Sequence, residues 1–183
     1  MISDVIAGLR AAPPRLGAVR LVAIDGPSGS GKSVLAERLT ADLRAAGVRA
    51  ALVPTDDFAT WTDPVSWWPR LVDGVLTPLR DGRPGRYRRN DWTSGAPRPG
   101  DEVTVDVPEL LIVEGVSAGR RSIRDRLSAL VWCELPDPAA RLARAVARDG
   151  EVNRDFLRAW QEFETGWFAV DGTREAATIV HPE

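Results

Sequence analysis

The sequence is poor in the residues that cross-link or anchor proteins. Its single cysteine, Cys133, has no second thiol in the chain, so a disulfide-stapled secreted fold is excluded. Its apolar runs span only a few residues, far short of the ~20 that a membrane-spanning helix needs. The first residues include Asp4 and lack a basic start followed by an apolar stretch, so no export signal is expected. These absences favour a cytoplasmic protein with no membrane partner.

Lysine is nearly missing as well. Of 24 basic residues, 23 are arginine, and Lys32 is the one lysine. A lysine kept against this bias suggests a position that needs a compact ammonium group rather than a planar guanidinium. The net charge of −2 over 183 residues gives no sign of a nucleic-acid partner. The length and composition indicate one globular domain, residues 1–183. The sequence leaves open whether it is a monomer or a homodimer.

Short apolar runs alternate with helical patterns along the chain. Strands are predicted at 21–24, 50–53, 110–113, 130–132 and 177–180, because each run is apolar and bounded by turn residues. Helices are predicted at 2–11, 35–43 (closed by Gly47), 71–79, from Asp137 onward and over 156–168. This alternation predicts a parallel sheet with helices on both faces, and ligands beyond the carboxyl ends of its strands.

The segment 59–107 interrupts the alternation. Its residues 82–101 are rich in glycine, proline and arginine, and polar–apolar alternation occurs at 86–92 and 102–107. This pattern favours a loop or hairpin excursion within one domain rather than a linker between two domains.

A phosphate-binding loop follows the first predicted strand. Residues 26–33 read GPSGSGKS, a full match to G-x-x-x-x-G-K-[ST] with a strand before it and a helix after it. Glycines let the backbone amides curl around phosphate oxygens, and the helix adds the positive end of its dipole. Lys32 would reach the terminal phosphates, and the Ser33 hydroxyl would hold Mg²⁺. The expected ATP-binding residues are Gly26, Pro27, Ser28, Gly29, Ser30, Gly31, Lys32, Ser33 and Val34.

Other nucleotide-binding classes fit less well. The guanine-reading motif Asn-Lys-x-Asp is excluded, because Lys32 already belongs to the phosphate loop. No transporter signature LSGGQ occurs, and the chain is short for a motor ATPase. Of the nucleotide-binding classes considered, a phosphotransferase is the one that still fits the sequence.

Carboxylates follow the second and third of the long buried strands. Asp56 and Asp57 come after the strand at 50–53, and Glu114 directly follows the strand at 110–113. Phosphoryl transfer to an alcohol needs one carboxylate to orient the hydroxyl and take its proton, and another to fix Mg²⁺. The alternative is that these acids are solvated turn or strand-end residues.

Taken together, these motifs resemble P-loop kinases of the uridine kinase and nicotinamide riboside kinase type. The resemblance rests, in order along the chain, on GPSGSGKS (26–33), TDDF (55–58), LLIVEG (110–115) and LPDPAARLARAVARD (135–149). It implies a three-layer α/β P-loop NTPase fold with a five-stranded parallel sheet and a mobile arginine-bearing lid. It also implies transfer of the γ-phosphoryl group of ATP, with Mg²⁺, to a hydroxyl of a small molecule, a nucleoside first of all.

Residue roles follow from the resemblance together with the motifs. The expected catalytic residues are Asp56, Lys32, Arg144 and Arg148, and the expected metal ligands are Ser33, Glu114 and Asp56. The expected substrate-binding residues, all in 57–115, are Asp57, Phe58, Trp61, Tyr87, Asp91, Trp92 and Gly115.

The predicted lid spans 137–155. Arg141, Arg144 and Arg148 are spaced by three and four, which places them on one stripe of a helix that could close over phosphates. A solvated helix face is the alternative, and Arg154 is a further candidate. The one histidine, His181, is given no catalytic role.

The acceptor is left open by the sequence. Tryptophans in the 59–107 excursion could stack on a flat ring or simply pack against the sheet. After the D-D-F residues, the aromatic residue expected of uridine kinases is replaced by Ala59 and Thr60. The alternatives to a nucleoside are a vitamin precursor, a sugar or an antibiotic as acceptor, or a regulatory nucleotide-binding module with little turnover.

Overall fold

A five-stranded parallel sheet forms the centre of the molecule, as the alternating pattern predicts. The computed structural model describes residues 2–93 and 95–182. The strands are β1 (Arg20–Asp25), β2 (Ala50–Pro54), β5 (Leu110–Glu114), β6 (Leu127–Glu134) and β7 (Ile179–Pro182). Their order across the sheet is β2-β5-β1-β6-β7, and all neighbours run parallel. The strand that carries the phosphate loop, β1, therefore lies in the middle.

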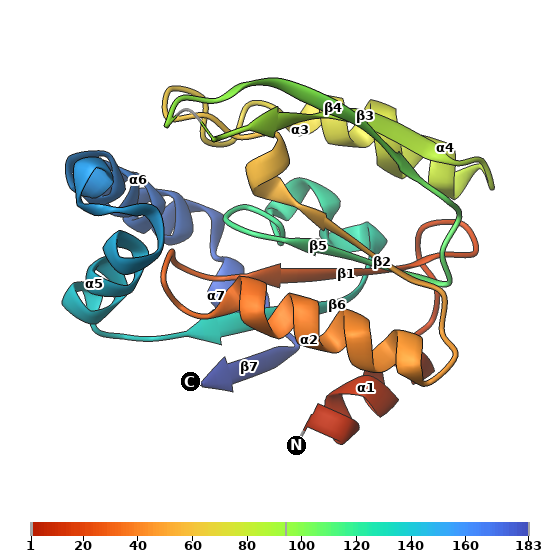
Figure 1. The fold of residues 1–183 in the computed structure, drawn as a ribbon. Helices are drawn as coiled ribbons and strands as arrows, with labels where there is room; N and C mark the ends of the chain where they lie inside the picture. Colours follow the sequence, from red (N-terminus) through yellow and green to blue (C-terminus); the bar gives the residue numbers. More distant parts are fainter. Residues whose placement is uncertain (1, 94, 183) are drawn as a thin grey trace.

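Alternate side chains of the strands point to two separate cores, which makes the fold three-layered (Figure 1). Val22 and Ile24 of β1 face the helices α1 (Ile2–Ala11) and α2 (Lys32–Ala45). Leu21 and Ala23 face the opposite core, which the excursion covers. Strands buried on both faces explain why the sequence shows continuous apolar runs instead of alternation.

The excursion contains a helical segment and a hairpin. The helical segment runs through α3 (Trp68–Leu71), a π-helical turn at Val72–Leu76 and α4 (Thr77–Arg80). The hairpin pairs β3 (Gly85–Asp91) with β4 (Arg98–Val105) in antiparallel fashion. A Cβ on Gly74 would lie 2.5 Å from the Arg86 carbonyl oxygen, so the absence of a side chain there lets the helical segment approach β3 closely. The predicted hairpin is thus found.

The segments that follow the carboxyl ends of the parallel strands β1, β2, β5 and β6 begin at one edge of the sheet (Figure 1). A 3₁₀ turn, Thr55–Asp57, follows β2, and another, Arg121–Arg126, precedes β6. The elements after β6 are α5 (Pro138–Asp149), a 3₁₀ turn (Glu151–Asn153), α6 (Arg154–Asp171) and α7 (Thr173–Ala176). The Asp137 carboxylate accepts a hydrogen bond from the Ala139 amide, which confirms the predicted helix start.

The carboxy-terminal strand, β7, differs slightly from the predicted run. The last strand begins two residues later than the predicted run, and His181 pairs with Cys133 within the sheet. Among the described residues, no helix is both long and apolar enough to cross a membrane.

Candidate active site

The glycines of the phosphate loop are required by close contacts on both sides of the loop. Gly26 has φ 143° and Gly29 has φ 79°, conformations that favour glycine. A Cβ on Gly26 would lie 2.3 Å from the Cys133 carbonyl oxygen. A Cβ on Gly29 would lie 2.4 Å from the Arg141 carbonyl oxygen. The loop is therefore fixed between the end of β6 and the first turn of α5.

A cavity of about 320 Å³ lies over this loop. Lys32, only 7 % exposed, donates a hydrogen bond from Nζ to the Pro27 carbonyl oxygen at 3.0 Å. This contact keeps the ammonium group against its own loop, next to the cavity. The residues that line the cavity are Gly29, Gly31, Lys32, Ser33, Val34, Arg144, Ala145 and Arg148. Five of the nine sequence-predicted ATP-binding residues thus line this cavity together with two arginines of α5.

The Ser33 hydroxyl lies beside the carboxylate of Glu114 at the end of β5. Ser33 Oγ donates to Glu114 Oε1 at 3.2 Å. The pKa of Glu114 is raised to about 7, chiefly by burial; the charge of Lys32 opposes this rise, and that of Asp56 adds to it. Among the described residues, no group of three or more His, Cys, Asp or Glu side chains could hold a metal ion alone. Two hard oxygen donors fit Mg²⁺ that takes its remaining ligands from phosphate and water.

Gly115 brings the ends of β5 and β2 together. It has φ 132°, and a Cβ at this position would lie 1.9 Å from the Thr55 Oγ1 atom. The contact seats the turn with Asp56 and Asp57 directly beside the strand that ends in Glu114. Gly115 therefore makes a close backbone approach possible, and its expected contact with substrate stays a prediction.

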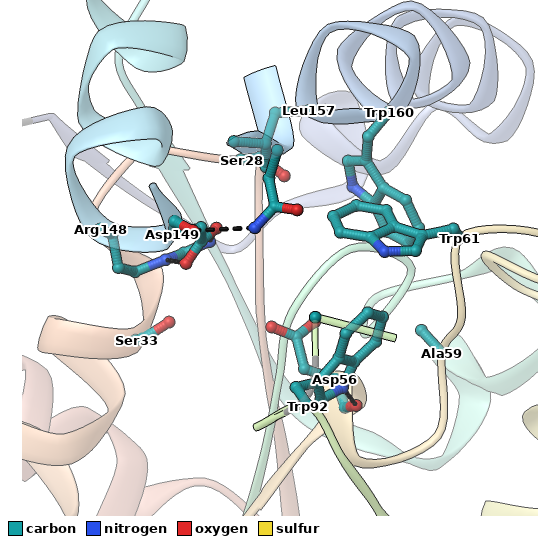
Figure 2. A pocket seen from close by; sticks show the side chains of 12 residues that line it. Ser28, Ser33, Asp56, Ala59, Trp61, Trp92, Arg148, Asp149, Leu157 and Trp160 are labelled. Atoms are coloured by element: carbon teal, nitrogen blue, oxygen red, sulfur yellow. Dashed lines mark hydrogen bonds and ion pairs between the residues drawn. The ribbon is translucent and has the colours of Figure 1, made fainter. Parts of the chain in front are cut away.

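A second cavity, of about 470 Å³, opens beside the phosphate loop (Figure 2). Asp56 lies on one side of it, and Ser33 and Arg148 lie across from Asp56. The Trp92 Nε1–H donates to the Asp56 carbonyl oxygen at 3.0 Å and so fixes the backbone of the acid. The lining residues are Ser28, Ser33, Asp56, Ala59, Trp61, Trp92, Gly95, Arg148, Asp149, Asn153, Leu157 and Trp160. Of the expected substrate-binding residues, Trp61 and Trp92 are among them.

Asp57, Phe58 and Tyr87 are not among the residues that line this second cavity. The Tyr87 hydroxyl donates to Asp57 Oδ2 at 2.5 Å, and burial raises the pKa of Asp57. Phe58 is 1 % exposed and stacks on Trp67 and Tyr87 with ring centroids 5.3 and 4.7 Å apart. The structure thus places Phe58 in the core, because the turn after β2 rotates successive side chains to different sides.

Asp91 also lies apart from the residues that line the second cavity. Its carboxylate is exposed, at the end of β3, and accepts a hydrogen bond from the Thr93 amide. The hydrogen bond to Thr93 lowers the pKa of Asp91. The geometry is that of a turn-stabilising acid at the tip of the hairpin.

The arginines of the predicted lid have different positions. Arg148 lines both cavities, and its Nε and Nη2 atoms each lie 2.6 Å from a carboxylate oxygen of Asp149. Arg141 is buried and donates to the carbonyl oxygens of Leu135 and Pro136, so it secures the start of α5. Of the predicted stripe, Arg144 and Arg148 border the phosphate cavity.

Arg154 pairs with Glu151 at the surface. It is among the residues of neither cavity. Arg154, the additional residue proposed for the lid from the sequence, is therefore held in a local ion pair.

Several residues that line the second cavity were not predicted as site residues from the sequence. Asn153, Leu157 and Trp160 come from the 3₁₀ turn and α6, where the apolar spacing indicated only a packed helix. Trp160 and Trp61 meet edge to face, with centroids 6.0 Å apart. Glu164, one turn further along α6, is 1 % exposed. An acid within an apolar helical stripe was the one available signal for it.

Three solved structures with a similar fold are described as kinases. A proposed uridine kinase from Bacillus stearothermophilus aligns with a TM-score of 0.72 at 18 % identity, over 98 % of this chain and 96 % of that one. A proposed fructose transport system kinase from Silicibacter sp. TM1040 aligns with a TM-score of 0.64 at 22 % identity, over 100 % and 99 %. The D-glycerate 3-kinase of Cryptococcus neoformans aligns with a TM-score of 0.61 at 16 % identity, over 89 % and 84 %. No family model and no curated protein sequence matches the chain.

The chain therefore has the P-loop NTPase α/β fold that these structures share. The resemblance to uridine kinase-like proteins, first indicated by four sequence motifs, is confirmed in the fold.

Proposed function

We propose that the protein is an ATP-dependent kinase that phosphorylates a hydroxyl of a neutral small molecule bearing a flat ring, such as a nucleoside. One observation carries the proposal: Ser33 and Arg148 line both cavities, so a phosphate site and an acceptor site share a wall. Asp56 lines the acceptor cavity alone. A nucleotide's terminal phosphate and an alcohol would meet at that common wall.

Each residue of the site would have a separate role in phosphoryl transfer. Loop amides and the Lys32 ammonium would hold the phosphates, and Arg148 would stabilise charge on the transferred group. Asp56 would orient the acceptor hydroxyl and take its proton as the hydroxyl oxygen bonds to the γ-phosphorus. The bond from that phosphorus to the β–γ bridging oxygen breaks, and ADP leaves. Mg²⁺, when bound near Ser33 and Glu114, would offset phosphate charge.

The acceptor class follows from the second cavity. Trp61, Trp92 and Trp160 line it together with Leu157, and indole faces are suited to stacking on a flat ring. The one basic side chain among its lining residues, Arg148, already pairs with Asp149. An anionic acceptor would therefore find little positive charge on that side. A neutral sugar is the second candidate, because its apolar ring faces could also pack on the indoles.

The test is a screen for acceptor-stimulated release of ADP. Purified protein with ATP and Mg²⁺ would be offered nucleosides, neutral sugars and glycerate as a matched anionic acceptor. We expect stimulation by a nucleoside and none by glycerate. Stimulation by sugars alone would select the second candidate. Tight ADP binding without stimulation by any hydroxyl compound would contradict kinase function and favour a regulatory nucleotide-binding module.

A further inference from the structure

A buried carboxylate of α6 contacts the phosphate loop at Ser28. The Ser28 amide lies 3.0 Å from both Oε1 and Oε2 of Glu164, and the Ser28 hydroxyl donates to Oε2 at 2.9 Å. Glu164 is 1 % exposed and is among the residues of neither cavity. Both polar donors of Ser28 are thus held by a side chain 136 positions away in the sequence.

The environment of Glu164 compensates its charge. Burial raises the pKa of Glu164, whereas the charges of Lys32 and Arg141 and the hydrogen bonds from Ser28 lower it. A buried carboxylate is costly without such partners, and an apolar residue would serve better if the position only needed to be filled. The contact therefore indicates a role for the acid at the loop.

The same helix also forms part of the acceptor cavity. Leu157, Trp160 and Glu164 are spaced by three and four, so they share one face of α6. Leu157 and Trp160 line the acceptor cavity, and Glu164 reaches the phosphate loop one turn later. One face of one helix therefore contacts both halves of the site.

From these contacts we infer that Glu164 is a positioning residue of the nucleotide site. Its carboxylate holds Ser28, which keeps the other loop amides aimed at the phosphates. It also makes the geometry of the loop depend on the docking of α6. The inference rests on the nucleotide use proposed above, and it adds a role that no loop motif contains.

The experiment compares ADP binding by calorimetry, with Mg²⁺ and without an acceptor, in wild type, Glu164→Gln and Glu162→Gln. Glu162 is an exposed acid on the same helix and is the matched control. We expect Glu164→Gln to weaken ADP binding about tenfold to a hundredfold, the range for losing charge-assisted hydrogen bonds. Glu162→Gln should bind as wild type does. The unfolding midpoints of both nucleotide-free variants should agree.

A second variant tests the same contact from the loop. Ser28→Ala removes the hydroxyl donor and keeps the amide, so it should weaken ADP binding by less than Glu164→Gln. In the double variant the losses should be smaller than the product of the two single effects. If Glu164→Gln does not fold, Ser28→Ala carries the test, and unchanged binding by it would overturn the inference.

Other outcomes are equally decisive. Unchanged affinity in Glu164→Gln would overturn the inference, and so would tighter binding, since the carboxylate would then compete with phosphate. A loss of affinity that follows a matching fall in the unfolding midpoint would show a merely structural role. In turnover assays, the ATP KM should rise while kcat at saturating ATP changes little. Normal ADP binding by wild type without transfer to any hydroxyl would refute the proposed function and leave the role of Glu164 standing.

Discussion

Replacing Asp56 with asparagine should abolish most transfer while leaving nucleotide binding intact. Asparagine keeps the size of the side chain but cannot take the proton of the acceptor hydroxyl. A general base contributes about 10²–10⁴ in rate, which corresponds to about 3–5 kcal/mol of barrier. We do not expect Asp57 to replace it, because Asp57 is not among the residues that line the acceptor cavity and its carboxylate accepts a hydrogen bond from the Tyr87 hydroxyl at 2.5 Å. We therefore expect kcat to fall within that range.

The affinity for ATP should not change in Asp56→Asn. Asp56 lines the acceptor cavity and is absent from the residues that line the phosphate cavity, so the ATP KM should stay near its wild-type value. Steady-state kinetics with the best acceptor from the screen measure both quantities. Asp57→Asn is the matched control, and it should retain far more activity than Asp56→Asn. Near-normal turnover in Asp56→Asn would refute the role of Asp56 as base.

Three further changes test the fold and the site. Gly115→Ala should lower the free energy of unfolding, measured by chemical denaturation, by about 2–4 kcal/mol, because its Cβ would overlap Thr55 Oγ1. In the control Gly166→Ala, the Cβ meets nothing within 4 Å, so this change in α6 should raise the free energy of unfolding by about 0.5–1 kcal/mol. Equal effects of the two changes would contradict this reasoning. Trp160→Ala should raise the acceptor KM about fivefold to a hundredfold, as expected for a lost stacking face, with the ATP KM as internal control; an unchanged acceptor KM would remove Trp160 from the site. Burial raises the pKa of Asp25 from 3.8 to about 7, so ionisation opposes folding as the pH rises through that window. The unfolding free energy of wild type should fall relative to Asp25→Asn by up to about 4 kcal/mol between pH 4 and about 7, and parallel pH profiles would refute this.

The phosphate half of the site could be predicted from the sequence because its information is local. The loop amides, Lys32 and Ser33 are contiguous, and the strand and helix on either side are visible as apolar patterns. Asp56 and Glu114 could be placed as well, since parallel strands deliver their carboxyl ends to one edge of the sheet.

The acceptor half could be predicted only in part. Trp160 has the same spacing as a core residue of an amphipathic helix, so no pattern distinguished a cavity wall from packing. Phe58 directly follows two acids, but the 3₁₀ turn at Thr55–Asp57 rotates it into the core. The partner of Glu164 lies 136 positions away, and only the docking of α6 brings the two together.

The strand order has a consequence for how the chain reaches its native state. β1 pairs with β5 and β6, and β2 pairs with β5, so neither early strand has a sheet partner before residue 110. Sequence-distant pairing of this kind is slow, because long loops must close before any pairing is rewarded. A growing chain would thus present the phosphate loop's strand without neighbours until more than half of the protein had been synthesised. The nucleotide site would assemble late and as one cooperative event.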